Sequence, residues 1–240
     1  MKSCAECMLC LLNRDIAAVP QEIDAEHKAA YLREVLAMLS QSDPALCTPQ
    51  LSARIDAIYE RHFGARKQKN FAELKRVYNE RLLALEPRLQ AVIDASDDPL
   101  ACAIKLARVG NYIDFGGRHE VDDALFDKLL ANASAETLDP AEYAHLVDEL
   151  ERAKRVVYLA DNAGEVVLDK LLLRLLLKRY PNAHFTLLVR GQPTLNDVTV
   201  EDARFVGLDA MLPVVGNGGA LPGTVLDELS DEARSLLEAA

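Results

Sequence analysis

The fold is decided by the stretch VVYLADNAGE at residues 156–165. Its first part, Val156–Ala160, is apolar and mostly branched or aromatic, which is typical of a short buried strand. A polar turn follows, and residues 166–180 then read VVLDKLLLRLLLKRY, the pattern of a leucine-rich helix. A strand, a tight turn and a helix open a βαβ unit. In open parallel sheets, ligands bind in the crevice at the carboxyl ends of the strands.

The turn after this strand carries an acid and an amide, Asp161 and Asn162. Both offer hard oxygen atoms that suit a divalent metal ion. A second interpretation is structural: Asn162 followed three residues later by Glu165 resembles a capping box, apart from Asn replacing Ser or Thr. The two interpretations are compatible, because one side chain can cap the helix while its neighbour binds an ion.

The carboxyl half of the chain alternates strands with helices. Further strands are predicted at residues 184–190 (HFTLLVR) and 212–215 (LPVV), with a short helix around 200–205 between them. This spacing implies a parallel sheet with right-handed crossovers. An amphipathic helix is also predicted at 141–153, before the first strand.

The amino half reads as helix throughout. Proline and Asp-Pro punctuation divides it into predicted helices at 4–18, 23–40, 49–63, 70–84, 87–95 and 99–109. We therefore predict an α/β fold with two domains: a helical domain at 1–130 and a Rossmann-like parallel-sheet domain at 131–240.

Other polar segments lie near the same predicted sheet edge or at the end of the helical half. Asp197 follows the second strand and is expected to approach Asp161, although it could also cap the helix that begins near Thr199. In the segment GNYIDFGG at 110–117, Asn111 and Asp114 could line a site or could merely satisfy turn donors. No G-x-G-x-x-G or P-loop pattern follows the first strand, so a nucleotide-binding domain is poorly supported.

Three cysteines recur at every third position, Cys4, Cys7 and Cys10. A CxxC pair is a candidate for metal or redox chemistry, but no separate second CxxC or His-x-x-x-His is present to complete a zinc site. Positions spaced by three also form a stripe on a helix, and cysteine is often a small buried residue. Core packing and thiol chemistry both remain open.

Composition limits the class of function. The chain has 240 residues, 50% of them hydrophobic, and a net charge of −11, which argues against nucleic-acid and anionic-membrane partners. It has no secretory signal pattern and no window of eighteen apolar residues. The odd number of cysteines, five, suits a reducing compartment, so we expect a cytoplasmic protein.

Taken together, several segments resemble a known family. They are CMLC at 7–10, DPL at 98–100, GNYIDFG at 110–116, DNAGE at 161–165, NDVT at 196–199 and PGT at 222–224. Their order and spacing resemble the damage-control phosphatases, first catalogued as domain of unknown function 89, in the stand-alone branch with an N-terminal CxxC. The resemblance covers nearly the whole chain.

The resemblance implies a function and a site. The family pairs a helical part with a Rossmann-like part, and its members are metal-dependent phosphatases of small phosphorylated metabolites that use Mn, Co, Ni or Mg. It implies that Asp161, Asn162 and Asp197 hold the metal and serve the catalytic step, in which metal-activated water attacks phosphorus. The site residues that it implies for substrate binding are Asn111, Asp114, Gly164 and Glu165.

The chain departs from the family pattern at its carboxyl end. The family's Lys-Gly-x-x-Asn loop is not found after the third strand, and the sequence ends just after a helix predicted at 227–237. We therefore expect a sheet truncated at that edge. An alternative function is a metal- and phosphate-binding protein with little or no turnover.

Two other functions compete with these. One is a redox or metal sensor that uses the cysteines. An aspartyl-phosphate mechanism at Asp161 is disfavoured, because Ala163 stands where a second Asp is usual. The sequence leaves the substrate, the metal and the oligomeric state open.

Overall fold

The computed structural model describes residues 3–64, 70–111 and 123–240 of the chain. The chain forms two compact units, Met1–Lys69 with Leu221–Val225, and Asn70–Ala220 with Leu226–Ala240. The boundary between the two units therefore lies next to residue 70. The sequence instead predicts that the helical domain ends near residue 130. The reason is that the helices between these positions share one hydrophobic core with the sheet.

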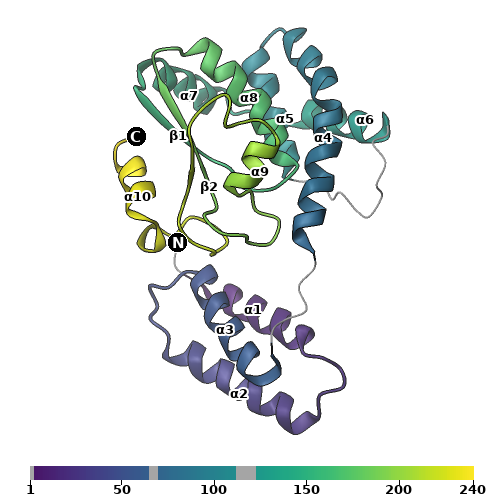
Figure 1. Cartoon of the computed structure of the whole chain (residues 1–240), viewed down its shortest axis with the longest axis vertical. Coiled ribbons are helices and arrows are strands. Elements are labelled where there is room, and N and C mark those ends of the chain that lie inside the picture. The colour runs from purple at the N-terminus through teal and green to yellow at the C-terminus, as the bar shows by residue number, and fades with distance from the viewer. Residues whose placement is uncertain (1–2, 65–69, 112–122) are drawn as a thin grey trace. The chain divides into compact units, whose positions relative to one another are not determined.

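The first unit contains three helices, α1 (Ala5–Ala18), α2 (Ala25–Gln41) and α3 (Thr48–Phe63), drawn in purple to blue in Figure 1. Apolar residues at helical spacing turn one side of each helix inward. The resulting core consists of Leu11, Tyr31, Val35, Leu39, Leu51, Ile55, Ile58 and Tyr59. The helix boundaries agree with the predicted ones to within about two residues, as expected for pattern-based assignment.

The cysteine stripe does not join this core. Cys4 and Cys10 are exposed and Cys7 is half-buried, while α1 buries Leu11 and Asp15 instead. The interpretation of the stripe as core packing is therefore wrong. The pattern of spacing gives a common face, but it does not say which way that face points.

The second unit holds the sheet and seven α-helices among its described residues. In chain order the elements are α4 (Phe71–Asp94), α5 (Pro99–Gly110), α6 (Asp123–Ala135), α7 (Pro140–Arg152), β1 (Arg155–Leu159), α8 (Glu165–Arg179), β2 (His184–Val189), α9 (Val200–Phe205), β3 (Val214–Gly216), the 3-10 turn Leu226–Glu228 and α10 (Asp231–Glu238). The three strands are parallel, in the order β1-β2-β3. The predicted α/β fold with a parallel sheet is confirmed.

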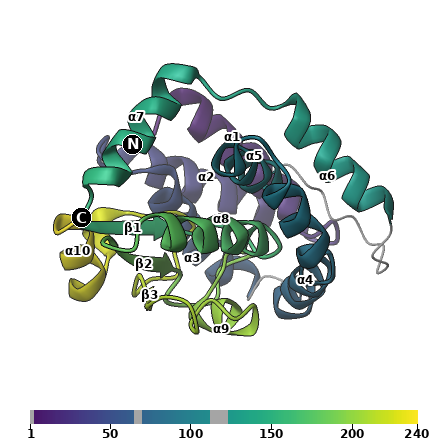
Figure 2. The ribbon, with the colours of Figure 1, turned by 90° about the horizontal axis from the view of Figure 1, so that it is seen from above.

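The alternation of side chains along the strands gives the sheet two apolar faces. One face, which includes Tyr158 and Leu187, belongs to the large core shared with α8. The other face, which includes Leu188, meets Leu229, just before α10, and Ala233, in the first turn of α10. Helices α4 and α5 both pack against α8 (Figure 2). Helix α8 is therefore covered on several sides, which explains why its sequence is leucine-rich nearly all round.

Helix α4 continues through Pro87, where the sequence predicts a break between two helices. Proline disfavours the helix interior because it removes one backbone hydrogen bond and crowds the preceding turn. Here Leu82, Leu85, Leu89 and Ile93 lie on both sides of the proline and are all buried in one core. Packing of that continuous stripe outweighs the local penalty. No described helix combines the length and the hydropathy that crossing a membrane requires.

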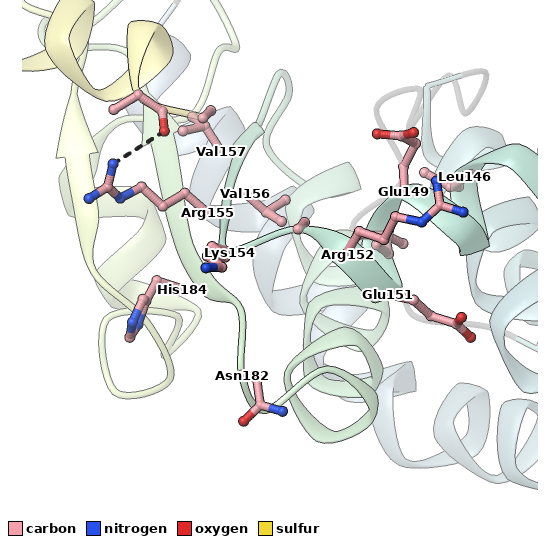
Figure 3. Close-up of a pocket in the computed structure, with 14 residues that line it drawn as sticks. Leu146, Glu149, Glu151, Arg152, Lys154, Arg155, Val156, Val157, Asn182 and His184 are labelled. Carbon is pink, nitrogen blue, oxygen red and sulfur yellow. Dashed lines mark hydrogen bonds between the residues drawn. The ribbon is translucent and has the colours of Figure 1, made fainter.

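A large pocket of the second unit lies beside β1, at the amino end of that strand. It has a volume of about 1020 Å³ and is lined by residues that include Leu146, Lys154, Arg155 and His184. Figure 3 shows Arg155 reaching across this region, where its Nη1 donates to the carbonyl of Ala239 at 3.5 Å. The pocket is therefore at the opposite end of β1 from the turn that carries Asp161.

Candidate functional site

The predicted site is built where two post-strand loops run side by side. The N–H of Ala163 donates to the carbonyl of Asn196 at 2.9 Å, and the N–H of Val198 donates to the carbonyl of Asp161 at 2.8 Å. Between these bonds, Asn162 and Asp197 form an antiparallel bridge. The loop after β2 is thus hydrogen-bonded to the loop after β1, and the two segments that the sequence singles out are brought together.

A sharp turn places the first of these loops at the start of α8. Gly164 adopts φ of 85°, a left-handed conformation that glycine tolerates best. Its N–H donates to Oδ1 of Asn79, a fully buried residue of α4, at 2.7 Å. This hydrogen bond anchors the turn at Gly164, a residue that the resemblance implies for substrate binding.

Side-chain oxygens gather around the amide of Asn162. Its Nδ2 lies 2.9 Å from Oδ2 of Asp161, 3.1 Å from Oε2 of Glu165 and 3.4 Å from Oδ1 of Asn111. An amide nitrogen has only two hydrogens for these three acceptors. On the other side, Asn196 Nδ2 donates to Oδ1 of Asn162 at 2.8 Å, which fixes the orientation of the amide.

Asp197 lies on the buried side of the cluster. Its Oδ2 accepts a hydrogen bond from Nε of Arg190 at 2.6 Å, and both residues are almost fully buried. A second nitrogen of the same guanidinium, Nη2, lies 3.5 Å from Oδ1 of Asp161, whose side chain is half exposed. Arg190 therefore links the two acids that follow β1 and β2.

The electrostatics of the cluster favour an added cation. Burial raises the pKa of Glu165, and the charge of Asp161 adds to that rise while hydrogen bonds from Asn162 oppose it. Burial also raises the pKa of Asp197, against the opposing effect of Arg190. Crowded, partly desolvated carboxyl groups resist ionisation unless positive charge is near. A divalent ion would supply that charge.

The donor chemistry also fits a hard divalent ion. Carboxylate and amide oxygens are the ligands that Mg²⁺, Mn²⁺ and similar ions accept. The cluster mixes acids with amides, and among the described residues no three His, Cys, Asp or Glu side chains form a metal-binding group by themselves. The amides of Asn162 and Asn111 therefore stand beside the carboxylates as further polar groups of the cluster.

The structure gathers five of the residues singled out from the sequence: Asn111, Asp161, Asn162, Glu165 and Asp197. Gly164 lies in the same turn, with its N–H directed to α4. Asp114 lies outside the described residues.

The residues that support this cluster are not singled out by the sequence patterns above. Arg190 is a charged residue at the end of a predicted apolar strand. Asn196 directly precedes Asp197 in the chain. Asn79 and Lys75 are four residues apart on α4, and both are buried. A polar residue on the buried face of an amphipathic helix is the signal that could have identified them.

The fold and this cluster define a Rossmann-like α/β protein with an oxygen-rich site at the carboxyl ends of its strands. Comparison with known proteins then gives the family. The profile of the damage-control phosphatase ARMT1-like domain matches residues 3–240, and the chain belongs to this family.

Two archaeal relatives agree with this assignment. A protein of Archaeoglobus fulgidus named a damage-control phosphatase is 35% identical over 177 residues, which cover 71% of this chain and 58% of the relative. A second, from Pyrococcus horikoshii and also named a damage-control phosphatase, is 28% identical over 246 residues, covering 97% of this chain and 79% of the relative. The chain thus covers less than two thirds of the first relative.

A solved structure supports the fold. The crystal structure of a DUF89 family protein from Pyrococcus horikoshii superposes with a TM-score of 0.75 at 23% sequence identity. The match covers 99% of this chain and 81% of that protein.

Proposed function

We propose that this chain is a metal-dependent phosphatase that hydrolyses a small phosphorylated metabolite, with the ion held by Asp161, Asn162 and Asp197. The observation that supports the proposal is the backbone pairing of the two post-strand loops, which brings the segments that carry these three residues together at one edge of the sheet. Membership of the damage-control phosphatase family supports the reaction class.

The neighbouring side chains would position these ligands. Arg190 holds one oxygen of the Asp197 carboxylate through its Nε. Asn196 sets the orientation of the Asn162 amide. As oriented here, that amide turns its nitrogen toward Asp161 and Glu165. Metal ligation would need a half-turn that presents the oxygen of Asn162 there, with Asn196 turning as well so that its Oδ1 accepts from Nδ2 of Asn162. Supporting contacts of this kind commonly change metal affinity by about 10- to 100-fold.

A bound divalent ion would polarise the phosphoryl group and lower the pKa of a water molecule for attack on phosphorus. Asn111 and Glu165 border the same position and are proposed to line the substrate pocket, together with Asp114 and Gly164. Glu165 is nine-tenths buried and its pKa is raised, so it is suited to hold a proton near the reacting group.

The test is a phosphatase screen on phosphorylated metabolites with Mn²⁺, Co²⁺, Ni²⁺ or Mg²⁺, beside a metal-free control. It compares the wild type with Asp161→Ala and with Asp209→Ala, a matched loss of an exposed acid in the same unit. Calorimetry with Mn²⁺ measures metal binding separately from turnover. Asp161→Ala should lose turnover by about 100-fold or more, the range for removal of a group that stabilises transition-state charge.

The two measurements separate the possible outcomes. Loss of both Mn²⁺ binding and turnover in Asp161→Ala, with Asp209→Ala unchanged, supports the proposal. Unchanged Mn²⁺ affinity in Asp161→Ala shows that the ligand assignment is wrong. Tight Mn²⁺ binding by the wild type without turnover of any phosphorylated metabolite would favour a binding protein over an enzyme.

A further inference from the structure

The sequence contains two overlapping CxxC pairs, and the structure distinguishes them. Cys4 is the N-cap of α1 and has an extended backbone, with φ of −99° and ψ of 177°. This places its Sγ 3.3 Å from Sγ of Cys7, in the first turn of the helix. Cys10 lies one turn further along, inside α1. Because Cys4 is the N-cap and is not held in helical geometry, its Sγ can come close to Sγ of Cys7. Cys7 and Cys10 both lie within the helix, where the backbone restricts such an approach.

The geometry of this pair suits a disulfide. A disulfide joins two sulfur atoms at about 2.05 Å, so the 3.3 Å separation of the two thiols needs to shorten by little more than an ångström. Cys4 is exposed and Cys7 is half-buried, so a small reagent in solvent can reach the pair. The bond would close a loop within one turn and would require no movement of another element.

Polar groups around Cys7 favour its thiolate. The start of α3 lies next to the start of α1, because the N–H of Ser3 donates to the carbonyl of Leu46 at 3.2 Å and Ser3 Oγ lies 3.3 Å from Oγ1 of Thr48. A hydrogen bond from the Thr48 hydroxyl, followed by hydrogen bonds from Cys4, lowers the pKa of the Cys7 thiol. The amino ends of helices also stabilise negative charge.

We propose that Cys4 and Cys7 form a dithiol–disulfide site that exchanges with low-molecular-weight disulfides. The Cys7 thiolate attacks one sulfur of the small disulfide, which breaks its S–S bond, forms a mixed disulfide and releases one small thiolate. Cys4 then loses its proton, attacks the sulfur of Cys7 and expels the second small thiolate. Two protein thiols are oxidised to one cystine, and one small disulfide is reduced to two thiols that take up the two protons.

The test uses the whole chain and glutathione as the probe. The protein is equilibrated in buffers of varied ratio of oxidised to reduced glutathione, with a chelator present, and free thiols are then trapped by alkylation. Mass spectrometry of the peptide that spans residues 3–14 counts and locates the alkylated cysteines. The variants are Cys4→Ser, Cys7→Ser and, as a matched control on the same helix, Cys10→Ser. Circular dichroism checks that each variant keeps its helix content.

The wild type should form one cystine between Cys4 and Cys7, and reduced glutathione should reverse it. Cys10→Ser should behave like the wild type, within about twofold in the equilibrium ratio, a difference of less than half a kilocalorie per mole. Cys4→Ser should stop at a mixed disulfide on Cys7. The proposal is overturned if the three thiols oxidise independently, or if the cystine forms through Cys10. Comparison of oxidised and reduced wild type needs no variant, so a poorly folded mutant would not obscure the result.

Discussion

The buried carboxyl of Asp169 allows a test of how burial makes the stability of this fold depend on pH. It lies on α8, one turn after Glu165, and its exposed fraction is only 3%. Its Oδ1 accepts a hydrogen bond from the hydroxyl of Tyr158 on β1 at 2.6 Å. Burial raises the pKa of this carboxyl from 3.8 to about 8; the bond from Tyr158 opposes the rise, and the charges of Glu165 and Asp161 add to it.

This shift makes stability depend on pH in a defined direction. Above pH 3.8 the unfolded chain loses the proton of Asp169, while the folded chain keeps it up to a pH of about 8. The folded state therefore binds more protons in this window, and the free energy of unfolding falls as pH rises, by about 1.4 kcal/mol per unit. The contribution of Asp169 to the free energy of unfolding is fully present below pH 3.8 and is lost as the pH rises through about 8. The whole rise corresponds to roughly 6 kcal/mol.

The substitution Asp169→Asn removes the titration and keeps the shape of the side chain. The amide oxygen can still accept the bond from Tyr158. The unfolding free energy of the wild type minus that of the variant should fall by about 3 kcal/mol between pH 5 and pH 7, two units at the slope above. Urea unfolding followed by circular dichroism, with a chelator present, measures it.

The matched control is Glu151→Gln, which removes an exposed acid of α7 in the same unit. Its difference from the wild type should stay within about 0.5 kcal/mol across the same pH range, as for surface substitutions generally. A difference between wild type and Asp169→Asn that does not change from pH 5 to pH 7 would refute the reasoning. It would mean that water or a cation reaches Asp169 and keeps it ionised.

Two further predictions concern the supports of the site. Arg190→Met leaves Asp197 buried without its guanidinium partner, so thermal unfolding should show a loss of about 3–5 kcal/mol; the control Arg152→Met, at an exposed ion pair, should lose about 1 kcal/mol or less. Equal losses would show that Arg190 has no special structural role. In Gly191→Ala the new Cβ would lie 2.4 Å from the backbone nitrogen of Gly218, so urea unfolding should show a loss of about 1–3 kcal/mol. An unchanged midpoint would contradict that close approach.

The sequence by itself determined the architecture of the sheet region. A run of apolar residues, a polar turn and a leucine-rich helix predict strand, turn and helix, because local periodicity reports which faces are buried. Topology then places the acids after β1 and β2 at one edge, and the pairing of Asn162 with Asp197 agrees with that expectation. The family also follows from motif order along the chain, and the profile match confirms it.

Only the tertiary structure decided which distant residues complete the site. Lys75 on α4 is buried and donates to the backbone carbonyl of Asp197, 122 residues away, at 3.2 Å. Asn79, on the same helix, holds the N–H of Gly164. Neither partner is encoded in local spacing, since each contact depends on how α4 packs against the loops that follow β1 and β2.

The same reason explains the elements that sequence analysis placed wrongly. Helix α4 passes through Pro87 because packing of its apolar stripe outweighs a local penalty. Cys4 and Cys10 are exposed and Cys7 is only half-buried, because Leu11 occupies the core instead. Local pattern fixes the type of an element and its faces. The direction of a face, the continuity of a helix and the partners of a buried charge depend on contacts between segments far apart in the chain, where removal from water makes each unpaired polar group costly.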